Sequence, residues 1–107
     1  MVAIRIAAPR TAKAGEVIEL KALIRHPMES GFRRGSRGEP IARDIIVAFD
    51  CLYNGDRVFH AEFFPAVAAN PFLSFHTRAT ESGTLEFRWT DQHGAVFADS
   101  VELTVEE

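Results

Sequence analysis

Short segments in which apolar and polar residues alternate make up most of the chain. Between residues 17 and 25 every second side chain is apolar, namely Ile18, Leu20, Ala22 and Ile24. Successive side chains of a strand point to opposite faces, so this period of two predicts a half-buried β-strand. The alternation recurs over residues 2–6, 45–53, 57–63, 72–80, 85–90 and 97–105. About seven strands at this spacing predict an all-β sandwich.

The dipeptide Asn54-Gly55 separates two of these segments and is the strongest hairpin signal in the chain. A type I′ turn needs positive φ at both central residues, which favours this pair. We therefore expect strands 45–53 and 57–63 to pair. One face of the first should consist of Ile45, Val47, Phe49, Cys51 and Tyr53. Pro65 should end the second strand, and residues 66–71 predict a tight connection, because they are too few for an independent helix.

Length and composition restrict the class of protein. The 107 residues suffice for one core, which predicts a single domain over residues 1–107. The net charge of −3 gives no global electrostatic support for a nucleic-acid partner. No apolar run is long enough to cross a membrane, and residues 1–6 alternate like a strand instead of resembling a signal peptide. A single cysteine excludes an internal disulfide.

The longest interruption of the strand pattern begins at His26-Pro27 and extends to residue 43. Pro27 disfavours the α region for the residue before it, and Gly31 permits a sharp reversal. Residues 25–44 hold five arginines and three acids, a local charge of +2, whereas the remainder of the chain carries −5. A basic loop on an acidic body attracts anions or an acidic partner surface. The residues expected to steer such a partner are His26, Arg33, Arg34 and Arg37, although solvation of a flexible loop explains the arginines equally well.

Nine phenylalanines against one tyrosine and one tryptophan supply the second functional signal. Most of them must be core, because each buried Phe contributes about 1.5–3 kcal/mol. Phe63 and Phe64 are adjacent on a strand, so they point to opposite faces and cannot both enter one core. One is left for a second surface, which suggests a protein partner. We expect this partner-binding surface to include Phe64, Asn70, Pro71 and Phe72.

No motif in the chain points to a catalytic site, a cofactor or a metal. The spacing of the four histidines (His26, His60, His76 and His93) matches no zinc or iron signature, although a sandwich can gather distant residues. Cys51 shares its strand face with apolar residues, where a thiol behaves as a small inert hydrophobe. Phosphate loops, nucleophile elbows and paired-carboxylate motifs are lacking. The expectation is a protein with no catalytic residues, no cofactor and no metal.

Several sequence blocks resemble one known family in their order and spacing. They are His26-Pro27-Met28-Glu29-Ser30-Gly31, Asn54-Gly55, Pro65-Ala66-Val67, Ala69-Asn70-Pro71, Glu81-Ser82-Gly83-Thr84, Trp89-Thr90-Asp91 and Gly94. Together they resemble SoxZ, the small subunit of the SoxYZ carrier complex in bacterial thiosulfate oxidation. The chain departs from the family's usual residues at Ala42, Phe64 and Phe72.

The resemblance implies an immunoglobulin-like sandwich that serves as a non-catalytic scaffold. The family's partner, SoxY, carries sulfur derived from thiosulfate on a cysteine of a mobile glycine-rich arm, and the pair passes between the Sox enzymes. The chain has no such arm, and Cys51 is not expected to replace the arm cysteine. The resemblance also implies a heterodimer with a SoxY-like subunit, transient contacts with Sox enzymes, and a periplasmic location reached by co-export with a signal-bearing partner.

Two other functions remain open from the sequence. One is a metal-dependent redox enzyme on an immunoglobulin-like sandwich, with some of the four histidines as ligands. The other is a generic adhesion or binding module. The metal content of the purified protein and co-purification with a SoxY-like subunit distinguish these alternatives from a carrier scaffold.

Overall fold

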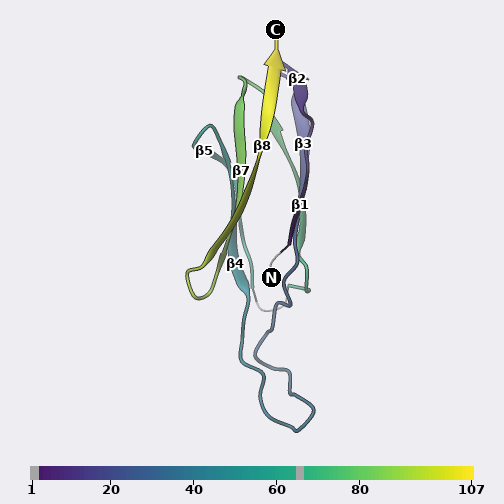
Figure 1. Ribbon diagram of the computed structural model, residues 1–107, viewed down its shortest axis with the longest axis vertical. Coiled ribbons are helices and arrows are strands. Elements are labelled where there is room, and N and C mark those ends of the chain that lie inside the picture. Colours follow the sequence, from purple (N-terminus) through teal and green to yellow (C-terminus); the bar gives the residue numbers. More distant parts are fainter. Residues whose placement is uncertain (1–2, 65–66) are drawn as a thin grey trace.

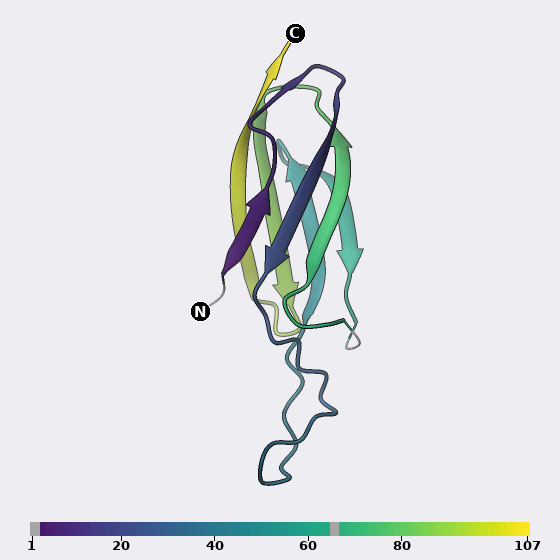
Figure 2. The same ribbon diagram turned by 90° about the vertical axis from the view of Figure 1, so that its right-hand side faces the viewer.

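The computed structural model describes residues 3–64 and 67–107, which form an all-β sandwich (Figures 1 and 2). The strands, in chain order, are β1 (Ile4–Ala7), β2 (Thr11–Lys13), β3 (Val17–Ile24), β4 (Ile46–Tyr53), β5 (Asp56–Glu62), β6 (Phe72–Arg78), β7 (Gly83–Asp91) and β8 (Val96–Glu106). The predicted fold class is therefore confirmed. Among the described residues there is no helix able to cross a membrane.

The strands form two sheets that face each other across the core. One sheet has three strands in the order β1-β3-β6, and the other has five in the order β2-β8-β7-β4-β5. All pairs are antiparallel except β2 with β8, which is parallel. β1 and β2 follow each other in sequence but belong to different sheets, so residues 8–10 cross from one sheet to the other. β2 is the strand that the alternation did not predict, since three residues are too few to show a period.

The predicted hairpin is confirmed. β4 and β5 pair in antiparallel register from Ala48↔Glu62 to Tyr53↔Asp56, and the two turn residues have φ values of 49° and 87°. The predicted face of β4 needs one correction. Ile45 and Ile46 are both buried and Val47 only half-buried, because the register with β7 shifts between Ile46 and Ala48. β5 ends at Glu62; Pro65 and Ala66 lie outside the described residues.

Aromatic side chains from both sheets meet at the centre of the core. Phe49 lies 4.9 Å from Trp89 between ring centroids and 5.7 Å from Phe75, which belongs to the opposite sheet. Phe75 also stacks on Phe59 at 4.3 Å with an interplanar angle of 11°. Offset and edge contacts of this kind add about 0.5–1.5 kcal/mol each to the free energy of burial. The two sheets are therefore joined most firmly at Phe75.

The hydroxyl of Tyr53 forms a second link, at the end of the sandwich away from the long loop. Thr80 and Glu81 each donate a backbone N–H to the Tyr53 hydroxyl oxygen, at 3.2 and 3.0 Å, and the hydroxyl donates to the Glu81 carbonyl. Tyr53 is buried at the end of β4, whereas Thr80 and Glu81 lie between β6 and β7. One phenol thus ties the β4–β5 hairpin to the chain segment that passes from one sheet to the other.

Replacement of Tyr53 by Phe is expected to lower the free energy of unfolding by about 1–3 kcal/mol, because two backbone N–H groups lose their acceptor. Urea denaturation of the two proteins measures the difference. Ser74→Ala, which also removes one hydroxyl but at an exposed position, should change stability by less than about 0.5 kcal/mol. Equal effects of the two substitutions would contradict this role of Tyr53.

Candidate partner-binding surface and loop

The chain between β3 and β4 projects from one end of the sandwich and extends the molecule along its long axis (Figures 1 and 2). The molecule measures 61 × 22 × 20 Å along its principal axes. Two isolated bridges, Glu29↔Asp44 and Arg34↔Pro40, hold the two arms of this loop together. Glu29 and Asp44 exchange backbone hydrogen bonds of 2.8 Å in both directions. The loop is therefore an irregular hairpin with an ordered base.

His26 and Asn70 join the base of this loop to the connection between β5 and β6. The backbone N–H of His26 donates to Asn70 Oδ1 at 2.9 Å, and the backbone N–H of Asn70 donates to the His26 carbonyl at 2.7 Å. Asn70 has a φ of 53°, a conformation that Asn tolerates better than most residues. Two residues that the sequence analysis assigned to different sites thus form one junction.

The His26 side chain is buried, with 6% of its surface exposed. Its Nδ1 accepts the backbone N–H of Met28 at 3.0 Å, which places the proton of the neutral ring on Nε2. Nε2 lies 3.7 Å from Asp44 Oδ1. The prediction that His26 belongs to an exposed steering surface is therefore wrong, because its buried side chain orients the first residues of the loop.

Met28 closes the base of the loop over the core. Its side chain is buried, and its sulfur accepts the backbone N–H of Ile46 at 3.3 Å. Its φ of 51° turns the chain outward in a conformation that is uncommon for a residue other than Gly, Asn or Asp. Apolar burial thus fixes where the loop leaves the sandwich.

The three arginines expected to steer a partner differ in their surroundings. Arg33 forms an ion pair with Glu29 at 2.5 Å, and the hydrogen bond from Arg33 holds the pKa of the Glu29 carboxyl below its ordinary value. Arg34 donates to the Gly38 carbonyl at 3.0 Å, and this neutral acceptor does not compensate the charge of the guanidinium. The backbone N–H of Arg37 donates to Glu39 Oε2 at 3.0 Å, and its guanidinium has no ion pair within residues 3–64 and 67–107. The uncompensated charge of the loop therefore lies nearer Arg34 and Arg37 than Arg33.

Phe32 is a functional candidate that the sequence analysis missed. Its side chain is 87% exposed, more than any other large apolar side chain among the described residues. One feature of the sequence indicates this exposure: Phe32 directly follows Gly31 in a loop with no alternating pattern. An apolar ring next to arginines is a common feature of surfaces that contact other proteins.

The second predicted site lies on and beside β6. Phe63 is buried, whereas Phe64 is 63% and Phe72 56% exposed, which confirms that the adjacent Phe63 and Phe64 face different environments. We define the Phe72 surface as the exposed or half-buried apolar residues Leu23, Phe64, Val67, Ala68, Ala69 and Phe72. Of the other predicted residues, Asn70 is exposed and occupied by the junction with His26, and Pro71 is buried.

Phe72 separates two shallow depressions on this surface. One, of about 450 Å³, is lined mainly by residues 67–73, and the other, of about 240 Å³, by Lys21 and Leu23 with residues 5–7 of β1. Leu23 pairs with Arg5 on one side and with Phe72 on the other, so the three form a row across the outer face of the three-stranded sheet. The surface is therefore apolar at its centre and charged at the β1 edge.

The remaining candidate residues do not assemble into a site. His60 Nδ1 lies 2.7 Å from Asp50 on the outer face of the five-stranded sheet, His76 is on β6, and His93 is in the turn before β8. No group of three or more potential ligands that could hold a metal ion occurs among residues 3–64 and 67–107. Cys51 is fully buried in β4, as predicted, and this burial raises the pKa of its thiol to about 12.

The two facing sheets define a β-sandwich domain of the immunoglobulin-like class. The chain belongs to the SoxZ family: the model of the family described as sulphur oxidation protein SoxZ matches residues 4–102. This confirms the resemblance, and with it the expected role in sulfur oxidation as the scaffold of a SoxYZ sulfur-carrier complex. Comparison with curated protein sequences gives no match.

Solved structures of other proteins share the fold. The superoxide reductase (neelaredoxin) from Ignicoccus hospitalis is 19% identical, with a TM-score of 0.74 over 96% of this chain and 80% of that one. The sulfur carrier protein SoxY from Chlorobium limicola f thiosulfatophilum is 17% identical, with a TM-score of 0.69 over 98% of this chain and 80% of that one. At these identities the likeness concerns the fold alone.

Cys51 is expected to resist thiol reagents in the native protein at neutral pH, because the thiolate is the reactive form. The thiol of the unfolded chain ionises at a lower pH than the buried thiol of the folded chain, so its ionisation above about pH 9 favours unfolding. The wild type should therefore lose stability relative to Cys51→Ala as the pH rises from 9 towards 12. Mass spectrometry after labelling, and urea denaturation against pH, measure the two effects. Rapid labelling of the folded chain at pH 7 would contradict the assignment.

Proposed function

We propose that this chain is the non-catalytic subunit of a heterodimer and that it holds a SoxY-like subunit through the Phe72 surface. The observation that carries the proposal is the exposure of two phenylalanines, Phe64 and Phe72, at the two ends of the connection between β5 and β6, on a sandwich whose other aromatic side chains are mostly buried. Stable interfaces are enriched in aromatic residues at their centre and polar at their rim. The two depressions on either side of Phe72 offer places for apolar side chains of the partner.

The partner, not this chain, carries the reactive sulfur in this proposal. Cys51 is fully buried and its thiol has a raised pKa, so it cannot serve as a mobile attachment point for a sulfur species. The chain contributes a rigid surface, and the complex reaches the periplasm by co-export with its signal-bearing partner. Sox enzymes contact the complex transiently.

The Phe72 surface makes the heterodimer sensitive to charge. Phe64→Glu and Phe72→Glu are each expected to weaken binding of the SoxY-like subunit at least about tenfold, which corresponds to 1.4 kcal/mol. The physical reason is the loss of apolar burial together with the desolvation of a carboxylate. Isothermal titration calorimetry measures the dissociation constants.

Val17→Glu is the matched control. Val17 is 53% exposed and lies on the same outer face of β3, but at the end of the strand away from Leu23 and Phe72. The Val17→Glu variant should bind the SoxY-like subunit with unchanged affinity. Full affinity in both Phe variants, or equal losses in all three, would place the interface elsewhere.

The loop over residues 26–43 is proposed to speed the encounter with an anionic sulfur species or an acidic enzyme surface. Its local charge of +2 stands on a body of −5, and it projects from one end of the sandwich (Figure 2). Exposed charges act mainly on association rates, and salt screens them. Arg34 and Arg37 carry most of this effect, because Arg33 is paired with Glu29.

Replacing Arg33, Arg34 and Arg37 together by Gln should slow the turnover of the loaded complex by a Sox enzyme at low ionic strength. The difference from wild type should shrink near 0.5 M salt, where the Debye length is about 4 Å by interpolation. A control that replaces Arg57, Arg78 and Arg88 by Gln changes the net charge equally but leaves the loop intact. Equal rates for wild type and the loop variant at low salt would show that the loop is only a solvated connection.

The alternative function is a metal-dependent redox enzyme, and the superoxide reductase shares the fold with this chain but no more. Elemental analysis of the purified heterodimer separates the two proposals. Stoichiometric iron, copper or zinc would favour the enzyme, and metal below stoichiometry would favour the scaffold.

A further inference from the structure

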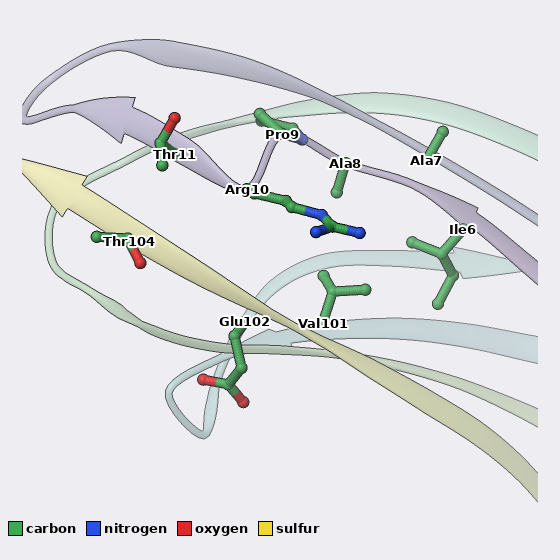
Figure 3. Close-up of a pocket in the computed structure, with 9 residues that line it drawn as sticks. All are labelled: Ile6, Ala7, Ala8, Pro9, Arg10, Thr11, Val101, Glu102 and Thr104. Atoms are coloured by element: carbon green, nitrogen blue, oxygen red, sulfur yellow. The ribbon is translucent and has the colours of Figure 1, made fainter.

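The outer edge of β8 is only partly covered by another strand. β8 has eleven residues, and β2 pairs with it only from Thr104 to Glu106. Beside the preceding residues, where the chain crosses from β1 to β2, lies a groove of about 710 Å³ (Figure 3). In the figure the side chain of Arg10 extends along this groove, between Ala8 and Val101. Within the described chain, residues 96–103 of β8 pair with β7 on one side and have no strand partner on the other side.

The direction of the free backbone groups follows from the pairing at the covered end. The N–H of Thr104 donates to the Arg10 carbonyl at 2.9 Å, so the even-numbered residues of β8 direct their N–H and C=O groups to this edge. Ala98, Ser100 and Glu102 thus present ladder groups that no other strand of the described residues pairs with. A long exposed edge of this kind is a template for pairing with another chain.

Asp99 stands in the middle of this edge and interrupts the apolar face of the strand. Its neighbours on that face, Phe97 and Val101, are half-buried against the core, whereas Asp99 is exposed. Its carboxylate accepts the backbone N–H of Ser100 at 2.8 Å, one of the donors that a docking strand needs. A charge on the face that otherwise packs inward is a known means of blocking edge pairing.

We propose that Asp99 prevents the free edge of β8 from pairing with the same edge of a second copy of this chain. This inference is independent of the Phe72 surface and of the proposed heterodimer. Two-fold symmetry makes β8 pair antiparallel with itself, and facing residues must point to the same side of the sheet. Two registers centre the contact on this part of the edge. In the first, Asp99 faces Asp99 of the second copy, and in the second it faces Val101.

Both registers are unfavourable. In the first, two carboxylates lie directly opposite each other in a narrow pair, where like charges destabilise a sheet. In the second, a carboxylate is pressed against a valine and loses water without gaining a partner. In either register Ser100 must also give up its hydrogen bond to Asp99. Without the carboxylate neither obstacle remains, and the exposed Val96 and Ala98 add apolar area to the contact.

The test is Asp99→Thr, which replaces the charge by a residue that favours strands. Sedimentation velocity should show a monomer for the wild-type chain and a dimer for the variant at the same concentration. Hydrogen exchange should show new protection at the amides of Ala98, Ser100 and Glu102. This protection locates the contact at β8, because association through the Phe72 surface would leave these amides exposed. Asp99→Ser, a smaller change, is the second variant if the first does not fold.

Asp56→Thr is the matched control, since it removes one exposed carboxylate from β5, the opposite edge of the same sheet. It should remain monomeric. The proposal is overturned if the folded Asp99 variants stay monomeric, if Asp56→Thr dimerises equally, or if the wild type already shows protection at the three β8 amides.

Discussion

The packing of Phe75 against the five-stranded sheet is the contact on which the rest of the molecule depends. The other rings of the central cluster, Phe49, Phe59, Phe87 and Trp89, all come from that sheet, and Phe75 is the one that the three-stranded sheet contributes. Because the two sheets share no backbone ladder, side-chain contacts of this kind set their spacing and angle. The Phe72 surface lies only three residues from Phe75 on the same strand, with the opposite orientation. The order of the core therefore determines the shape of the proposed interface.

The end of the sandwich that carries the loop is organised by hydrogen bonds instead. His26 and Asn70 link the base of the loop to the connection between β5 and β6, and the buried Met28 side chain bonds to the backbone of Ile46 at the start of β4. The projecting hairpin and the Phe72 surface thus have a fixed relation to each other. A partner bound at one is presented at a defined place relative to the other.

Much of the fold follows from local patterns in the sequence, because strand faces and a type I′ turn depend on neighbouring residues. The alternation of Leu85, Phe87 and Trp89 and the dipeptide Asn54-Gly55 are of this kind. β2 was not predictable, since its partner on β8 lies more than ninety residues away in the chain. The bulge that buries Ile46 beside Ile45 also depends on a register with β7 that no local pattern encodes.

Some features of the candidate sites follow from local sequence, and others depend on residues that are distant in the chain. The opposite environments of Phe63 and Phe64 follow from the alternation of side chains along β5, which ends at Glu62 directly before them. The burial of His26 does not, because its hydrogen-bonding partner Asn70 is forty-four residues distant. Asp99 was recognisable as a break in an apolar face, but its function requires the knowledge that β2 leaves most of β8 uncovered.

The bonds that secure the base of the loop leave its outer part free to evolve. Arg43, next to the Glu29–Asp44 bridge, still bonds to Gln92 of the sandwich, whereas residues 32–41 of the described chain are held by the Arg34–Pro40 bridge and by contacts within the loop itself. The entropic cost of closing a loop grows only slowly with its length. Insertions, deletions and changes of charge in residues 32–41 therefore leave the stability of the sandwich almost unchanged. Descendants of one scaffold can in this way acquire loops of different length and charge without a new fold.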